Sequence, residues 1–289
     1  RGDELGALDH LLARAAAAAS TVRVLTGDAG TGKSALIDWA IAEARQRGFT
    51  VLRATGVEFE RQLSFSGLTA VLRPVLDRIE GLDTGHARAL KTAFGLVDGE
   101  AGLLAVHGAT LALIASAAEQ APVLVAVDDA HWIDQSSMES LVFAAHRCDA
   151  DRVLFLFARR PEHACLLDRT EFERIEVAGL DRDSAVELLR ATGVSAEVAG
   201  RCWELTRGNP LALLETGRSL TPEQRRGDEP LPAVLPLGDR LLDSFGPWID
   251  SLPPATLVAL GVAALDPDDD VSRVSAALAV IDGKLDDLC

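Results

Sequence analysis

The stretch VRVLTGDAGTGKS, residues 22–34, decides the fold of this chain. Its first residues, among them Val22, Val24 and Leu25, are aliphatic and predict a buried strand. The strand runs directly into a glycine-rich turn with GxxxxGKS spacing, made of Gly27, Asp28, Ala29, Gly30, Thr31, Gly32, Lys33 and Ser34. The sequence therefore predicts a loop that binds phosphate groups.

The residue types of this loop suit a nucleoside triphosphate. Glycine lets the backbone curl so that successive N–H groups point at phosphate oxygens, and the helix that includes Ala35 presents its positive N-terminal end to the same anion. Lys33 adds a full charge at the β- and γ-phosphates, and the Ser34 hydroxyl can ligate Mg²⁺. We expect ATP or ADP with Mg²⁺ as cofactors; the alternative is a surface turn without a ligand.

Strand and helix patterns alternate along the first part of the chain. The predicted strands are residues 22–26, 50–54, 122–127, 153–158 and 175–177, with helical periodicity between them. This alternation implies a parallel sheet covered on both faces. The predicted fold class is therefore α/β, a P-loop NTPase with a parallel five-stranded sheet.

The strand at residues 122–127 delivers two acids, Asp128 and Asp129, to the edge of the sheet. We expect Asp128 to hold Mg²⁺ and Asp129 to orient the attacking water as the catalytic base. The alternative is that both acids cap a turn. Glu58 or Glu60, after the second strand, is a rival base, for which we prefer a solvated loop.

Composition limits the classes of function. The chain has 289 residues and a formal net charge of −16, so we expect no direct DNA binding by these residues. Four cysteines without CxxC spacing favour reduced thiols over a metal site. The apolar residues 102–118 fit a helix buried inside the protein, and we expect a cytoplasmic protein without membrane association. Because the first residue is Arg1 rather than Met, we expect a part of a longer protein.

Beyond Gly179 the pattern changes to helices alone. We expect a core at residues 1–178, a helical lid at 179–220, an extended linker at 221–237 and a small helical unit at 238–289.

These motifs together resemble the nucleotide-binding region of the STAND class of AAA+-related ATPases, and most closely the large ATP-binding regulators of the LuxR family. The resemblance rests on RGDEL (residues 1–5), GDAGTGKS, LVAVDDAHWID (residues 124–134), the strand ending in Arg159, and TRGNPLALLE (residues 206–215). The resemblance implies an AAA+ strand order, a helical lid and the start of a winged-helix domain at 238–289.

The resemblance also implies roles for single residues. Pro210 would lie near the adenine base, Arg1 would belong to the nucleotide pocket, and Arg159 would act catalytically by sensing the γ-phosphate. A surface charge is the alternative for Arg159, and Arg160 is the fallback sensor. His131 either touches the γ-phosphate or packs beside Trp132 as a loop histidine.

The leading functional hypothesis is a switch domain that binds and slowly hydrolyses ATP in a signal-responsive transcriptional regulator. Its expected partners are the nucleotide, an unknown small-molecule or protein inducer, and other copies of the full-length protein in a nucleotide-dependent assembly. A phosphotransferase acting on a small molecule and a nucleotide-bound scaffold that never hydrolyses are the alternatives.

Overall fold

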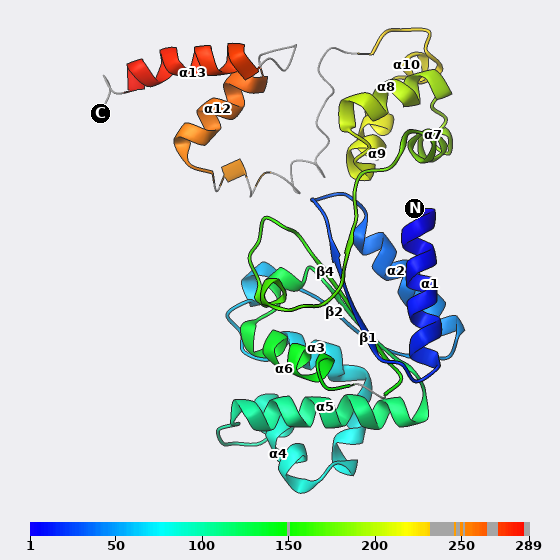
Figure 1. Cartoon of the computed structure of the whole chain (residues 1–289), viewed down its shortest axis with the longest axis vertical. Helices are drawn as coiled ribbons and strands as arrows, with labels where there is room; N and C mark the ends of the chain where they lie inside the picture. Colours follow the sequence, from blue (N-terminus) through cyan, green and yellow to red (C-terminus); the bar gives the residue numbers. More distant parts are fainter. Residues whose placement is uncertain (149–150, 232–245, 247–248, 251, 265–270, 286–289) are drawn as a thin grey trace. The chain divides into compact units, whose positions relative to one another are not determined.

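The computed structural model describes residues 1–148, 151–231, 246, 249–250, 252–264 and 271–285 (Figure 1). Two compact units are separated within it, Arg1–Leu231 and Pro232–Cys289, and each is treated by itself below.

The first unit contains a five-stranded parallel sheet in the order β2-β3-β4-β1-β5. All five strands predicted from the sequence are confirmed; their bounds are β1 Thr21–Thr26, β2 Thr50–Thr55, β3 Val123–Asp128, β4 Val153–Arg159 and β5 Arg174–Glu176. Every residue of β3 and β4 is buried, which explains their unbroken apolar sequence. Val24 and Val127 both pair with Phe157, so β1 and β3 end close to the same edge of the sheet.

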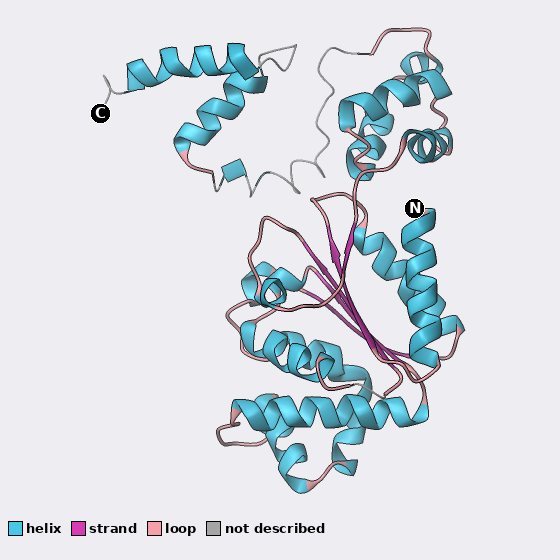
Figure 2. Ribbon diagram, viewed as in Figure 1, coloured by secondary structure: helices cyan, strands magenta, loops and turns pink. Residues whose placement is uncertain are grey.

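Helices cover both faces of the sheet (Figure 2). On one face, α1 (Gly2–Ala16) and α2 (Lys33–Gln46) pack on Leu25, Leu124 and Leu156. The other face packs against α3 (Ser66–Leu72), α4 (Thr84–Ala93), α5 (Leu103–Gln120) and α6 (Gln135–Ala145). Pro74 lacks the N–H that an α-helix needs there, and the chain after α3 accordingly continues as a 3₁₀ helix, η2 (Arg73–Gly81).

Helix α5 is long and apolar enough to cross a membrane, by length and composition alone, and no other helix among the described residues passes that test. Its side chains at Val106, Leu113 and Ile114 are fully buried in the core beneath the sheet. Only 39% of the helix is buried, and Leu103 and Leu104 at its start are exposed, so one face of the helix lies in the core and the expectation of a helix buried inside the protein is met only in part.

A small helical bundle follows β5. It consists of α7 (Arg182–Arg190), α8 (Ala196–Thr206), α9 (Pro210–Ser219) and α10 (Pro222–Arg226), around a core that includes Leu189, Cys202 and Leu213. Helix α10 lies within the stretch expected to be an extended linker. Thr221 and Gln224 form a reciprocal capping box, and Pro222 occupies the first helical turn, where its missing N–H costs nothing.

In the second unit, the described residues include α12 (Pro254–Ala264) and α13 (Val271–Leu285). The expected helical character of this part is confirmed. Residues 232–245 and 265–270 lie outside the described residues, so the linker end and the winged-helix assignment stay predictions.

Asp134, which is 2% exposed, connects the starts of helices α3 and α6 through hydrogen bonds. Its carboxylate accepts hydrogen bonds from the amides of Phe65 (2.9 Å) and Gly67 (3.0 Å) at α3. It also accepts from the amide (3.0 Å) and the hydroxyl (2.6 Å) of Ser137 at α6. One buried carboxylate therefore joins the segments that follow β2 and β3.

Replacing Asp134 by alanine would leave these buried amides without an acceptor. We expect Asp134→Ala to lower the free energy of unfolding by about 3 kcal/mol. Urea unfolding measures this, with the exposed Asp98 as the matched control, for which Asp98→Ala should change stability by less than about 0.5 kcal/mol. Equal stability of the two variants would contradict the role given to Asp134.

Candidate functional site

The loop between β1 and α2 has the backbone of a phosphate cradle. Gly30 (φ 77°) and Gly32 (φ 95°) are left-handed, a conformation that glycine adopts without strain. The Thr31 hydroxyl closes the turn by donating to the Asp28 carbonyl at 2.9 Å. Ser34 and Ala35 lie exposed in the first turn of α2, where backbone N–H groups are free to meet an anion. The predicted loop residues are thus brought together.

Lys33 lies over this loop. Its ammonium donates to the carbonyls of Gly27 (2.7 Å) and Asp28 (2.8 Å), and the residue is 6% exposed. Burial lowers the pKa of Lys33, as does the charge of Arg160, whereas Asp129 and Asp128 raise it. The two acids therefore lie within electrostatic reach of the amine, as the sequence predicted.

Asp128 and Asp129 have different environments at the end of β3. Asp128 is 5% exposed, and its carboxylate accepts the Asp129 amide at 2.9 Å. Asp129 adopts the left-handed conformation (φ 44°), uncommon for a residue other than glycine, where the chain leaves the strand. Burial and the neighbouring Asp128 raise the pKa of Asp129, while Arg160 and Lys33 lower it. A carboxylate with a raised pKa accepts a proton more readily at neutral pH.

Arg159 pairs with Thr26, the residue before the phosphate loop, but its side chain is bonded to the loop after β4. Its guanidinium is 3% exposed, donates to the carbonyls of Arg160, Pro161 and His163 at 3.0–3.1 Å, and pairs with Asp168. In this arrangement the Arg159 side chain shapes the loop after β4, and the sensor role expected of Arg159 stays a prediction. The fallback fits better, because Arg160 Nε lies 3.7 Å from Asp129 Oδ1.

His131 is packed into an aromatic cluster. Its ring stacks on His163 with centroids 4.8 Å apart and contacts Trp132 at 5.0 Å. Its Nε2 lies 3.8 Å from Asp129 Oδ1, and neither ring nitrogen has a hydrogen-bond partner among the described residues. Burial first, and then the charges of His163 and Arg160, lower the pKa of His131 to about 3. The histidine is therefore neutral at physiological pH and packs beside the base candidate.

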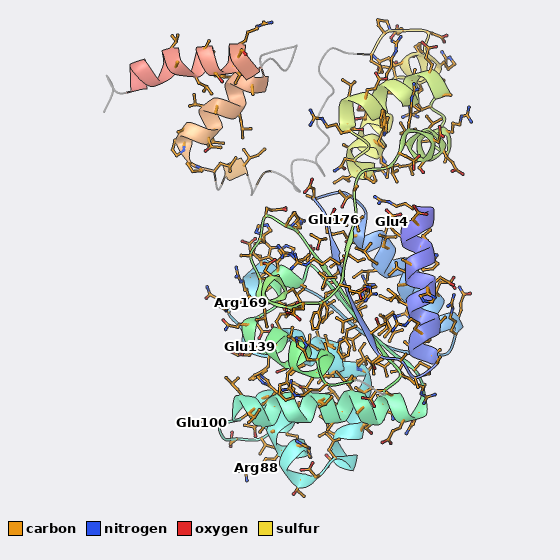
Figure 3. The ribbon with its side chains drawn as sticks, in the orientation of Figure 1. Glu4, Arg88, Glu100, Glu139, Arg169 and Glu176 are labelled. Carbon is orange, nitrogen blue, oxygen red and sulfur yellow. The ribbon has the colours of Figure 1, made fainter. Side chains whose placement is uncertain are left out.

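Arg1 joins three parts of the first unit. Its guanidinium donates to the carbonyl of Thr31 in the loop and to the carbonyl of Ala178 (2.8 Å) after β5, and it pairs with Glu4 (2.7 Å). Figure 3 shows Glu4 and Glu176 at the same end of the core. A cavity of about 420 Å³ opens here, lined by residues that include Arg1, Gly179 and Asp181.

The helical bundle is hydrogen-bonded directly to the phosphate loop. Asn209 donates through Nδ2 to the Ala29 carbonyl (2.8 Å), and the Leu211 amide donates to the Gly30 carbonyl (3.2 Å). The other oxygen of the same side chain, Asn209 Oδ1, caps α9 by accepting the Ala212 amide at 3.1 Å. We call these two loop contacts the clasp. Pro210 stands between the two clasp residues at the start of α9.

Asn209 was not among the residues predicted from the sequence. Its place before a proline signals a helix N-cap, but no local pattern indicates a bond to a loop 180 residues away. His163 was also missed, because its stacking on His131 depends on the path of the loop after β4, which no local pattern indicates.

The rival bases, Glu58 and Glu60, lie in a short 3₁₀ helix, η1 (Glu58–Glu60), after β2. This segment begins beside the site, because the Gly56 amide donates to the Asp128 carbonyl at 2.9 Å. Glu58 is exposed and Glu60 half-buried. Neither forms an ion pair among the described residues, so both remain alternatives to Asp129.

The residues present fit a nucleotide and one hard cation. A Cβ at Gly30 would lie 2.8 Å from Asn209 Oδ1, so the loop requires glycine where the bundle meets it. The oxygens of Ser34 and Asp128 are donors that Mg²⁺ accepts, and Mg²⁺ typically takes its other ligands from phosphates and water. The described residues contain no group of three or more His, Cys, Asp or Glu side chains placed to hold a metal alone.

The shifted pKa of His131 predicts a pH dependence of stability without nucleotide or Mg²⁺. Its pKa is about 3 in the folded chain and 6.5 ordinarily, so the unfolded state binds the extra proton between these values. Stability should be complete above pH 6.5 and fall on acidification, by up to about 1.4 kcal/mol per pH unit.

Urea unfolding between pH 7 and pH 5 measures this slope. His131→Phe keeps an aromatic ring and should flatten the slope, whereas His10→Gln, at an exposed site on α1, should leave it unchanged. A slope that persists in His131→Phe would show that another group carries the pH dependence.

Comparison with known proteins adds a family. A family model described as an AAA ATPase domain matches residues 1–157. No curated protein sequence matches the chain.

Several solved structures share similarity at low identity. A STAND protein with a tetratricopeptide repeat sensor from Pyrococcus horikoshii is 17% identical, with a TM-score of 0.47, over 92% of this chain and 34% of that one. Drosophila ORC bound to DNA is 13% identical, with a TM-score of 0.49, over 99% of this chain and 74% of that one. A mutant RuvB of Thermotoga maritima is 12% identical, with a TM-score of 0.44, over 75% of this chain and 61% of that one.

The chain spans about a third of the length of that STAND protein. The family model, by contrast, covers more than half of this chain and includes the phosphate loop and both acids at the end of β3. This chain therefore belongs to the AAA ATPase domain family, the P-loop ATPases of AAA+ type.

Proposed function

We propose that this chain is the ATP-binding and slowly hydrolysing switch domain of a signal-responsive transcriptional regulator of the LuxR type. The observation that carries the proposal is the clasp, in which Asn209 and Leu211 bond to the carbonyls of Ala29 and Gly30. A nucleotide that moves the loop must also move the helical bundle, because the two are hydrogen-bonded. Such coupling is what a switch requires and what a simple hydrolase does not need.

Binding would use the residues already described. The backbone from Gly27 to Ala35 would receive the phosphates, with Lys33 leaving its loop carbonyls for the β- and γ-phosphates. Ser34 and Asp128 would hold Mg²⁺, which when bound offsets the charge of the triphosphate. The cavity beside Arg1 would take the ribose and base side of the nucleotide, with Pro210 on the bundle side.

Hydrolysis would depend on Asp129. Its raised pKa and its place beside Asp128 suit a carboxylate that orients a water and accepts its proton. Arg160, 3.7 Å from Asp129, is the arginine best placed to sense phosphate, since Arg159 is bonded within its own loop.

Magnitudes favour a switch built from several contacts. A charge-assisted contact to phosphate contributes about 1.5–3 kcal/mol, whereas inverting a two-state equilibrium takes about 5.5 kcal/mol. A single sensor is therefore insufficient, and the clasp and the Arg1 contacts would add the difference between states.

The regulator role rests on the resemblance of RGDEL, DDAHWID and TRGNPLALLE to the LuxR-type STAND regulators. We propose a cytoplasmic protein in which an inducer and nucleotide-dependent self-association act through domains beyond this chain, as does DNA binding. The net charge of −16 is consistent with no DNA contact by these residues.

The first test concerns binding and turnover. Lys33→Ala should weaken ATP binding at least tenfold, the equivalent of about 1.4 kcal/mol, because a buried charge-assisted contact is lost. Calorimetric titration measures this, with Lys91→Ala as the control, because the half-buried Lys91 of α4 pairs with Glu80 and belongs to no part of the site.

Asp129→Asn should keep ATP affinity and lose phosphate release. Turnover that survives in this variant would transfer the role of base to Glu58 or Glu60. Absence of single-turnover phosphate release in the unmodified protein would instead identify a scaffold that never hydrolyses.

The second test concerns the clasp. Asn209→Ser keeps a side-chain oxygen that can cap α9 but is too short to reach Ala29. We expect the free energy of unfolding to fall by up to about 1 kcal/mol, the contribution of one hydrogen bond, and ATP affinity to fall about fivefold because the bundle no longer follows the loop. Asn209→Ala should lose the cap as well and be less stable than Asn209→Ser by about 1 kcal/mol. Full ATP affinity in both variants would refute the coupling.

A further inference from the structure

Strand β2 is an edge of the sheet and offers its outer side for pairing. Among the strands that the structure describes, it bonds only to β3, in parallel, through amides such as that of Thr50, which donates to the Pro122 carbonyl at 2.8 Å. The Gly56 amide, an even number of residues after Thr50, also points toward β3 and donates to the Asp128 carbonyl. Because N–H and C=O groups alternate in direction along a strand, those of Val51, Arg53 and Thr55 point away from the sheet.

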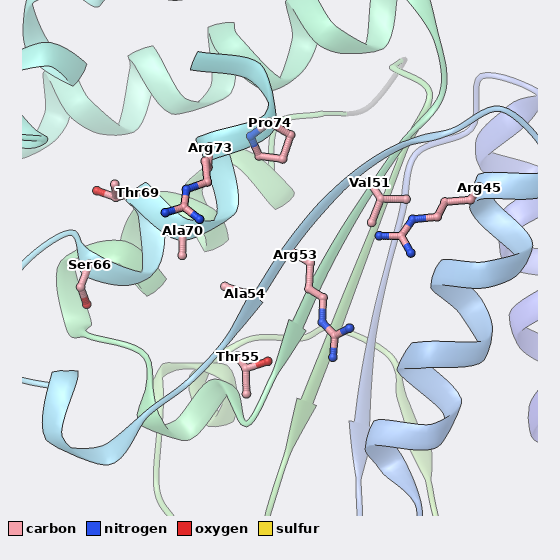
Figure 4. A pocket seen from close by; sticks show the side chains of 10 residues that line it. All are labelled: Arg45, Val51, Arg53, Ala54, Thr55, Ser66, Thr69, Ala70, Arg73 and Pro74. Carbon is pink, nitrogen blue, oxygen red and sulfur yellow. The ribbon is translucent and has the colours of Figure 1, made fainter. Parts of the chain in front are cut away.

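A groove runs along these outward-pointing residues (Figure 4). It has a volume of about 560 Å³, and its lining includes all three of them, together with Arg45 of α2 and residues of α3 and η2. Figure 4 shows Arg45 on the helix at one side, Thr69 and Arg73 on the other, and Arg53 on the strand between them. The groove therefore has a strand edge as its floor and helices as its walls.

The groove is basic in an acidic chain. Arg45, Arg53 and Arg73 come from three different elements and are all exposed. Arg53 pairs with Asp38 at 3.0 Å, whereas no described carboxylate pairs with Arg45 or Arg73. Two cations thus remain for a partner, in a chain whose net charge is −16.

We propose that this groove binds an extended acidic segment of a partner protein, which adds to the sheet as a further strand beside β2. The outward N–H and C=O groups of Val51, Arg53 and Thr55 would pair with the backbone of the segment, and the arginines would pair with its carboxylates. The site is separate from the phosphate loop, so the proposal does not depend on the proposed function.

Two other occupants fit less well. A second copy pairing β2 with β2 would bring its basic groove against this one, and like charges across paired strands are destabilising. A nucleic acid would meet the arginines but has no peptide backbone to pair with the strand edge, so the outward N–H and C=O groups of β2 would stay unpaired.

The experiment titrates the whole chain into a fluorescein-labelled ten-residue peptide of alternating glutamate and valine, followed by anisotropy at low salt. A second peptide has the same sequence with alternate backbone nitrogens methylated, so that it keeps its charge and cannot pair on one edge. We expect saturable binding of the first peptide and at least about tenfold weaker binding of the second, since several backbone hydrogen bonds are lost. Equal binding of the two peptides, or none of the first, would overturn the proposal.

Charge variants test the walls of the groove. The double variant Arg45→Glu with Arg73→Glu should weaken peptide binding about tenfold or more, because two exposed charge contacts become repulsive. Arg88→Glu, on α4 and outside the groove lining (labelled in Figure 3), should bind within about twofold of the unmodified chain. Binding that survives the double variant would contradict the proposal. A single-stranded oligonucleotide that displaces the peptide at lower concentration would assign the groove to nucleic acid instead.

Discussion

The arrangement of the first unit depends on the phosphate loop, because this loop must curl around an anion and also hold the helical bundle. Gly30 must be left-handed for the phosphate loop to curl, and a side chain there would also collide with Asn209. Ala29 and Gly30 use their carbonyls, rather than their amides, to bind the helical bundle. The amides therefore stay free for an anion while the same residues hold the bundle in place.

The chemistry of the site comes from ionisable side chains that are buried. Burying them costs stability, which other parts of the fold must offset. Lys33, Asp129 and His131 each have a pKa displaced toward the neutral form, and in each case burial is the largest cause. Burial of an ionisable group lowers the free energy of unfolding, but it also gives the group the shifted pKa that catalysis uses. The satisfied carboxylate of Asp134 and the fully buried strands β3 and β4 offset part of that cost.

Much of the fold could be predicted from the sequence because its signals are local. The apolar runs at β3 and β4 and the glycines of the phosphate loop specify strands and a curled turn without reference to distant residues. The roles of Arg159 and Asn209 could not be derived in this way. Whether Arg159 faces the site depends on the carbonyls of the loop after β4, and the bond from Asn209 to Ala29 depends on how the bundle docks. Charge type and helix capping can be predicted from sequence, whereas the direction of a side chain between two loops depends on tertiary packing.

The central claim is that the phosphate loop and the helical bundle respond together to nucleotide. Amide hydrogen exchange of the whole chain during a titration with ATP and Mg²⁺ tests it most directly. The account predicts that residues 27–35 and residues 209–216 gain protection with the same half-saturating ATP concentration. Protection of the loop alone, with exchange in residues 209–216 unchanged at saturation, would contradict it.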